Sequence, residues 1–185
     1  MRLNDSISEA LRKYGRKVIL ESRKNLNDYK KGDSDLFNSI RSNVNREGNS
    51  MVLTFTLPDY WTYVNYGVKG IGGTKADGTS WQVKNVTNSP YAYKDKGPSI
   101  AVLDAWASRK GITPDGFGAT PSSRESMLYA ISKSVLHTGV QTTNFFTDAL
   151  TYQLEDMEND LEIVVANSLA DVLKGKLTNN RLRIN

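Results

Sequence analysis

The stretch YAISKSVLHTGVQTTNFFTDAL, residues 129–150, joins two segments with helical periodicity, and the rest of the chain is arranged around it. Gly139 is the residue type that takes the left-handed conformation at helix C-termini, so we expect it to end the first helix. Thr143 is expected to cap the second helix, which begins with Phe145 and Phe146. Two adjacent aromatic residues cannot face one stripe of a helix, so one is expected to pack inward and the other against a neighbouring element or subunit. Taken alone, the stretch is typical of a corner between two helices of a small domain.

The composition indicates a soluble, globular protein. The chain has 185 residues, enough for one domain with a modest core, and 38% of them are hydrophobic. No apolar run approaches the roughly 20 residues of a transmembrane helix, and the N-terminal residues lack the apolar core of a signal peptide. Cysteine is absent, which excludes disulfides and thiolate chemistry and fits assembly in the cytosol. A net charge of +4 indicates nucleic-acid binding only weakly.

The N-terminal third of the chain predicts a helix followed by a β-hairpin. Residues 4–29 have the periodicity of an amphipathic helix, and Ser6 with Glu9 forms a capping box at its start. Its Lys and Arg residues form a second face, which either contacts phosphates or is simply solvated. Residues 40–57 alternate apolar and polar side chains around a Gly-Asn-Ser turn, which predicts the hairpin. A lone hairpin is marginal in water, so its apolar face is expected to lie on the first helix.

The middle of the chain combines an aromatic segment with a glycine-rich loop. Residues 60–67 (YWTYVNYG) follow Pro58 at an expected helix start and contain no Lys or Arg, so packing or a subunit interface is favoured over base stacking. Residues 67–80 lack the pattern of a phosphate loop and are expected to be an exposed loop. Residues 81–87 are expected to form a third strand. Residues 98–110 and 122–137 are expected to form two helices, with residues 111–121 as the loop between them.

The last helical pattern is the longest in the chain. Its apolar residues keep helical spacing from Phe146 to about Leu173, which corresponds to about 45 Å at 1.5 Å per residue. Such a helix exceeds the diameter of a small domain, so part of it is expected to contact another helix of the chain or a neighbouring subunit. Its middle is acidic and the tail after Gly175 is basic, so copies of the chain can attract one another head to side. That tail is expected to be mobile unless a partner orders it.

No pattern in the sequence indicates catalysis. His137 is the only histidine, and no nucleophile elbow accompanies it. A histidine at the surface or at a helix end is therefore favoured over a catalytic one, and a single histidine without cysteine disfavours a zinc site. We expect no enzyme and no cofactor, while an unfamiliar active site around His137 stays a minor alternative.

The order of these segments resembles that of a known family. The segments that carry the resemblance are residues 36–40 (LFNSI), 60–67 (YWTYVNYG), Trp106, 110–112 (KGI), 129–139 and 144–150 (NFFTDAL). In this order they resemble, over about residues 4–173, the tail-completion or neck proteins of tailed bacteriophages, the group often called HK97 gp10-like. The long loops at residues 67–80 and 111–121 depart from the commonest members of that family.

The resemblance implies an α+β fold, in which a small antiparallel sheet packs against long N- and C-terminal helices, with an inserted helical segment. It implies one domain over residues 1–175, with the two long loops as insertions, and a mobile tail over residues 176–185. It also implies a structural protein of the virion, assembled in the host bacterial cytoplasm, that forms a homo-oligomeric ring in the neck. The residues expected at a subunit interface or in packing are Tyr60, Trp61, Tyr63, Tyr66, Trp106, Phe145 and Phe146.

The partners implied by the resemblance are further copies of the chain, head connector or adaptor proteins, and tail terminator or tail tube proteins. Genomic DNA would pass through the lumen of such a ring, and no membrane partner is implied. A nucleic-acid-binding accessory protein is the alternative, supported by the net charge and by the Lys and Arg face of the first helix. A steep fall of DNA affinity with salt would favour that alternative.

Overall fold

A computed structural model describes residues 3–29, 34–86, 88–114 and 121–181 of the chain. The chain divides into two compact units, the first formed by Met1–Asp59 together with Phe145–Asn185 and the second by Tyr60–Asn144. The expectation of one domain over residues 1–175 stays a prediction.

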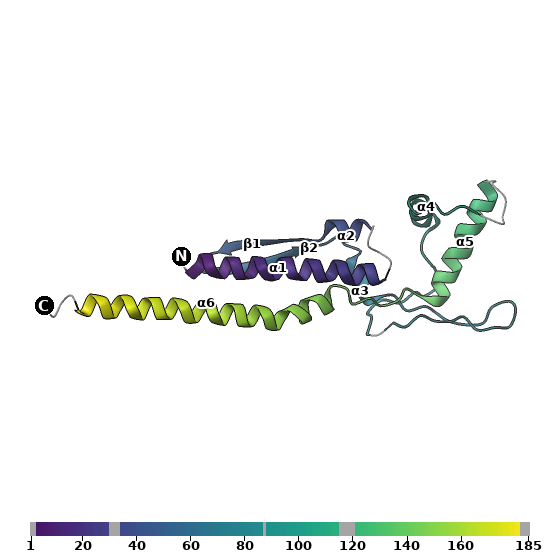
Figure 1. The fold of residues 1–185 in the computed structure, drawn as a ribbon. Coiled ribbons are helices and arrows are strands. Elements are labelled where there is room, and N and C mark those ends of the chain that lie inside the picture. Colours follow the sequence, from purple (N-terminus) through teal and green to yellow (C-terminus); the bar gives the residue numbers. More distant parts are fainter. Residues whose placement is uncertain (1–2, 30–33, 87, 115–120, 182–185) are drawn as a thin grey trace. The chain divides into compact units, whose positions relative to one another are not determined.

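The first unit is built on two long helices that lie side by side (Figure 1). These are α1, Leu3–Asp28, and α6, Thr147–Arg181. Between them in sequence come the short helix α2, Asp35–Ser39, and the strands β1, Arg41–Glu47, and β2, Ser50–Thr56. The two strands pair antiparallel along their whole length. The predicted α+β fold, with a small antiparallel sheet against long N- and C-terminal helices, is therefore confirmed.

The hairpin packs on α1, as its alternating pattern predicts. Val44 pairs with Leu53, and Ser42 pairs with Phe55, so their side chains share the face toward the helix. Gly15 of α1 allows this close approach, because a Cβ atom at that position would lie 2.8 Å from Ser42 Oγ. The short helix α2 precedes the hairpin and is capped by Ser34, whose hydroxyl accepts a hydrogen bond from the Phe37 amide.

The core of the first unit lies between α1, α2, the hairpin and the start of α6. Its largest fully buried apolar side chains come from α1, from α2 and the residue after it, and from the turn before α6: Val18, Leu26, Leu36, Ile40 and Phe145. An aromatic series runs beside them, with Tyr14 edge-on to Phe55 at 6.5 Å between ring centroids and Phe55 edge-on to Phe146 at 5.3 Å. The start of α6 is thereby fixed to the sheet.

The second unit contains the helices α3, Trp61–Tyr66, α4, Ile100–Arg109, and α5, Pro121–Thr138. Helices α4 and α5 pack together through Leu103, Ala107, Met127 and Leu128. The long connection between α3 and α4 is held by backbone hydrogen bonds at the end of α5, where Val68 forms a bridge with Val140. Gly139 has φ of +79° and ends α5, as its residue type predicts.

Several predicted boundaries are wrong. The final helix begins at Thr147, so Phe145 and Phe146 lie in the turn before it, and Thr143 does not cap it. The Thr143 hydroxyl instead donates to the backbone oxygen of Val64, a partner distant in sequence that local patterns cannot reveal. The same helix continues to Arg181, beyond the expected end near Leu173.

Other predicted elements shift or are absent. Helix α3 starts at Trp61 rather than at Pro58, and α4 starts at Ile100 with Ser99 as its cap. The predicted third strand does not form over residues 81–86, while Thr87 lies outside the described residues. The Trp81 amide donates to Gly73 O and the Lys84 amide to Thr138 O, so loop and helix-end carbonyls take the amides that a strand partner would have used. Helix α5 starts at Pro121, one residue before the predicted start, and residues 115–120 of the predicted loop lie outside the described residues.

Candidate subunit interface

The aromatic residues singled out in the sequence are divided among separate places. In the second unit, Trp61 packs on Tyr66 of the same helix at 6.4 Å, and the exposed Tyr63 packs on Tyr91 at 4.4 Å. Tyr60, just before α3, is also partly exposed. The helix α3 therefore carries two aromatic pairs rather than one continuous surface.

Trp106 lies elsewhere in the second unit, on the edge of the α4–α5 contact. Its neighbour Ala107 is fully buried in that contact. Trp106 itself is more than one-third exposed. A large aromatic side chain at the rim of a packed helix pair can serve as an anchor for a partner.

Phe145 and Phe146 belong to the core of the first unit. Their exposed fractions are 0% and 6%, and their ring centroids are 6.2 Å apart. Phe145 packs inward, and Phe146 packs against β2 through Phe55. Both residues therefore stabilise the fold of a single chain.

The contact between α1 and α6 is polar along part of its length. Lys13 pairs with Asp160 at 2.7 Å, and Lys17 pairs with Asp156 one turn away. Hydrogen bonding between Lys17 and Asp156 raises the pKa of the lysine and lowers the pKa of the carboxyl. The basic face of the first helix and the acidic middle of the last helix are each visible in the sequence, far apart along the chain. Their equal four-residue spacing is the signal that could have paired them.

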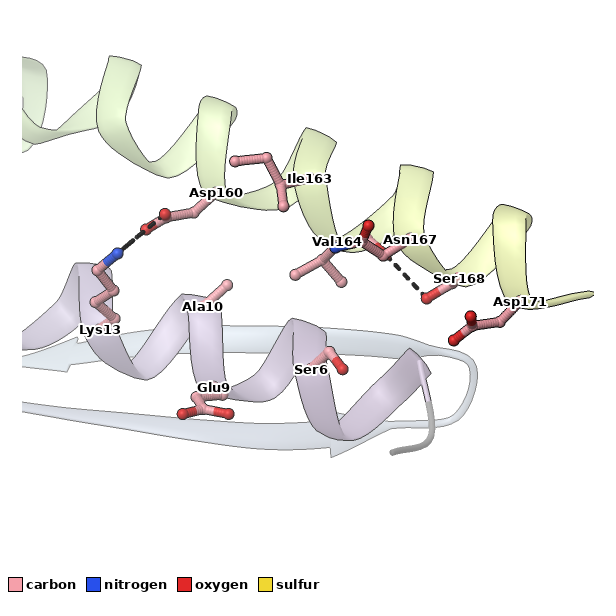
Figure 2. A pocket seen from close by; sticks show the side chains of 10 residues that line it. All are labelled: Ser6, Glu9, Ala10, Lys13, Asp160, Ile163, Val164, Asn167, Ser168 and Asp171. Atoms are coloured by element: carbon pink, nitrogen blue, oxygen red, sulfur yellow. Dashed lines mark hydrogen bonds and ion pairs between the residues drawn. The ribbon is translucent and has the colours of Figure 1, made fainter.

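A groove of about 380 Å³ opens between α1 and α6 near the start of α1 (Figure 2). Small side chains on α1, Ser6 and Ala10, leave room opposite Val164 and Ser168 of α6. The Lys13–Asp160 pair closes one end of the groove, as Figure 2 shows. Within the described residues, no group of three or more His, Cys, Asp or Glu side chains is placed to hold a metal ion.

The last helix presents a second apolar surface that does not contact α1. The outer face of α6, as we call it, consists of Leu154, Glu158, Leu161, Glu162, Val165 and Leu169. Leu154 is 41% exposed and Leu169 is 60% exposed, which is high for leucine. From Glu158 onward the face forms an open groove of about 550 Å³. The sequence predicted one apolar stripe on this helix, and the structure divides it between the α1 contact and this outer face.

His137 has a local structural role at the end of α5. Its Nδ1 lies 2.6 Å from Gly72 O, and its ring stacks on Trp81 at 4.9 Å with an interplanar angle of 6°. Lys75 lies over the other ring of this stack, 5.1 Å from the Trp81 centroid. The expectation of a helix-end histidine is met in position, and the ring serves to attach the glycine-rich loop.

Comparison with protein-family models, with curated proteins and with solved structures gives no match for this chain. Among the helices of the described residues, none combines the length and the apolar character that crossing a membrane requires. The candidate interface therefore rests on the geometry of the chain itself.

Proposed function

We propose that this protein is a structural component of a tailed-phage virion and forms an oligomeric ring in the neck, between the head connector and the tail. The proposal joins the resemblance in segment order to the surface properties of α6. Its partners would be further copies of the chain, the head connector or adaptor proteins, and the tail terminator or tail tube proteins.

The observation that carries the proposal is the outer face of α6. Fully burying one aliphatic side chain contributes about 1.5–3 kcal/mol, and this face exposes several of them in a row along one helix. Soluble monomers rarely leave a continuous apolar surface uncovered unless it binds something. A neighbouring subunit that covers this face would account for its composition.

The nucleic-acid alternative gains little from the arrangement of charges. Lys13 and Lys17, which belong to the basic face of α1, are engaged by Asp160 and Asp156 of the same chain. Phosphate contacts by these lysines would require those ion pairs to break. Arg12 and Arg16 stay exposed.

The test of the proposed function combines solution mass with particle assembly. We expect the purified chain to form a discrete ring in multi-angle light scattering and electron microscopy, or to form one when phage neck complexes are added. An infection that lacks the protein should yield packaged heads and free tails that do not join. A stable monomer that never enters particles, and that binds DNA with a steep salt dependence, would overturn the proposal in favour of the alternative.

A further inference from the structure

We propose that the outer face of α6 docks on a second surface of the same fold, presented by α1 of the neighbouring copy. The outer face of α1, as we call it, consists of Arg12, Arg16 and Leu20. This inference rests on the proposed function, because it names the surfaces through which copies of the chain would form a ring.

The outer face of α1 is distinct from the two faces that the helix already uses. Gly15 faces the hairpin, and Lys17 faces α6. With 3.6 residues per turn, Arg12, Arg16 and Leu20 lie together on the remaining side. Leu20 is 65% exposed. Neither arginine forms a hydrogen bond or an ion pair with any residue that the structure describes.

The outer face of α6 carries the complementary charges. Asp156 and Asp160 point toward α1, where they pair with lysines. Leu154, Glu158 and Glu162 follow one another at four-residue steps on another side of the helix, and all three are exposed. Within the described residues, neither glutamate has an ion-pair partner. The outer face of α6 is therefore acidic and apolar, whereas the outer face of α1 is basic and contains one leucine, so the two faces are complementary in charge.

The spacing of the two faces matches when the helices run antiparallel. Each face has one leucine and two like charges at four-residue steps. On α1 the leucine comes last in the sequence, after Arg12 and Arg16, whereas on α6 it comes first, before Glu158 and Glu162. An antiparallel contact therefore brings leucine onto leucine and both arginines onto glutamates. The three pairs are Leu20 with Leu154, Arg16 with Glu158, and Arg12 with Glu162.

The register of this contact keeps neighbouring copies level with one another. Within one chain, Lys17 faces Asp156 across antiparallel helices. The proposed contact joins Arg16, one residue before Lys17, to Glu158, two residues after Asp156. The two registers differ by about one residue, or roughly 1.5 Å along the helix. Copies added in this way are displaced sideways with little rise, which is what a closed ring requires and a helical filament does not.

Pairing of two α6 outer faces is the main alternative contact between copies. It would place Glu158 and Glu162 of one copy near the same residues of the other. Like charges opposite one another in an interface are destabilising, so this isologous contact is disfavoured. The heterologous contact uses a different surface on each copy and leaves one of each unused, so further copies can be added.

Disulfide trapping tests the contact directly, since the natural chain has no cysteine. We expect the double variant Leu20→Cys with Leu154→Cys to form a ladder of disulfide-linked oligomers under mild oxidation. A disulfide needs Cα atoms within about 7 Å, so only close approach gives efficient linkage. The matched control is Leu20→Cys with Lys94→Cys, because Lys94 is an exposed loop residue of the second unit and belongs to neither of the two outer faces.

A charge exchange provides the second test. Arg16→Glu and Glu158→Arg should each weaken self-association about tenfold or more, and the combined variant should restore it. Lys94→Glu, on an exposed loop residue of the second unit, changes the net charge like Arg16→Glu and should leave association unchanged. Linkage of Leu154→Cys mainly to itself, or no linkage above the control, would overturn the inference.

The two proposals fail in different ways. If the wild-type chain forms rings or enters particles but the cysteine pair does not link, the surfaces are wrong and the proposed function stands. If the pair links specifically but the protein never enters particles, the contact stands and the virion role is wrong. A chain that neither links nor enters particles overturns both.

Discussion

Replacing Phe145 with alanine tests whether this residue belongs to the core of one chain or to a contact between chains. The side chain is fully buried in the first unit, although the sequence left both roles open. Truncation of a fully buried phenylalanine costs about 3–5 kcal/mol, because the lost transfer free energy adds to that of the cavity left behind. Since domains are stable by only about 5–15 kcal/mol, Phe145→Ala should remove a large fraction of the stability.

Urea unfolding followed by far-ultraviolet circular dichroism is the appropriate assay, because α1 and α6 contain most of the helical residues. With an m-value of about 2 kcal/mol/M, the expected loss shifts the unfolding midpoint by about 1.5–2.5 M urea. The control is Tyr152→Ala, which truncates a side chain that is 73% exposed and should change stability by no more than about 0.5 kcal/mol.

Protein concentration separates the two roles of Phe145. A core residue lowers stability by the same amount at every concentration, whereas a residue at a subunit contact has an effect that changes with dilution. We expect the loss to be constant over a hundredfold range. A cost below about 1 kcal/mol, or one that varies with concentration, would refute the assignment of Phe145 to the core.

Three further predictions follow from local features. Gly139→Ala should lower the free energy of unfolding by more than about 1 kcal/mol, because φ is +79° and the added Cβ would lie 2.5 Å from Val68 O. Tryptophan fluorescence reports on the second unit, so urea unfolding followed by fluorescence measures this loss, and an unchanged unfolding midpoint would contradict the prediction. The small stabilisation from Lys17 and Asp156 should be constant near neutral pH, since the carboxyl pKa is lowered and the lysine pKa raised. It should disappear as the pH falls through the lowered carboxyl pKa, or rises through the raised lysine pKa, and the melting temperatures of wild type and Lys17→Met should then converge at both extremes. Replacing loop residues 75–78 with a short glycine linker should leave circular dichroism unchanged and, if the loop contacts a neighbouring ring, prevent particle assembly; normal infectious particles would exclude that contact.

The parts of the fold that were predictable from the sequence are those with a clear local period. The long first helix, the hairpin and the end of α5 at Gly139 all follow from spacing and residue type, and all are confirmed. The packing of the hairpin on α1 also followed, because an isolated hairpin cannot bury its apolar face.

The missed features depend on partners that are distant along the chain. Thr143 has the residue type of a helix cap, but its hydroxyl is taken by Val64 O of a segment almost 80 residues earlier. The candidate strand at Trp81 has suitable residues, but its amide bonds to the glycine-rich loop. No local pattern carries such information. The outer face of α6 was missed for a related reason, since one apolar stripe and two adjacent ones look alike until the position of α1 is known.

The unequal lengths of α1 and α6 have a practical consequence. Asp171 lies beside Ser6 near the beginning of α1, so the last turns of α6 extend past the shorter helix, as Figure 1 shows. A helical segment of about two or three turns is only marginally stable in water without a surface to pack on. Its susceptibility to trypsin, which cleaves after the basic residues from Lys174 onward, would therefore report whether that end of the helix is covered. The rate of cleavage at this end of α6, compared between free protein and assembled particles, would therefore measure assembly.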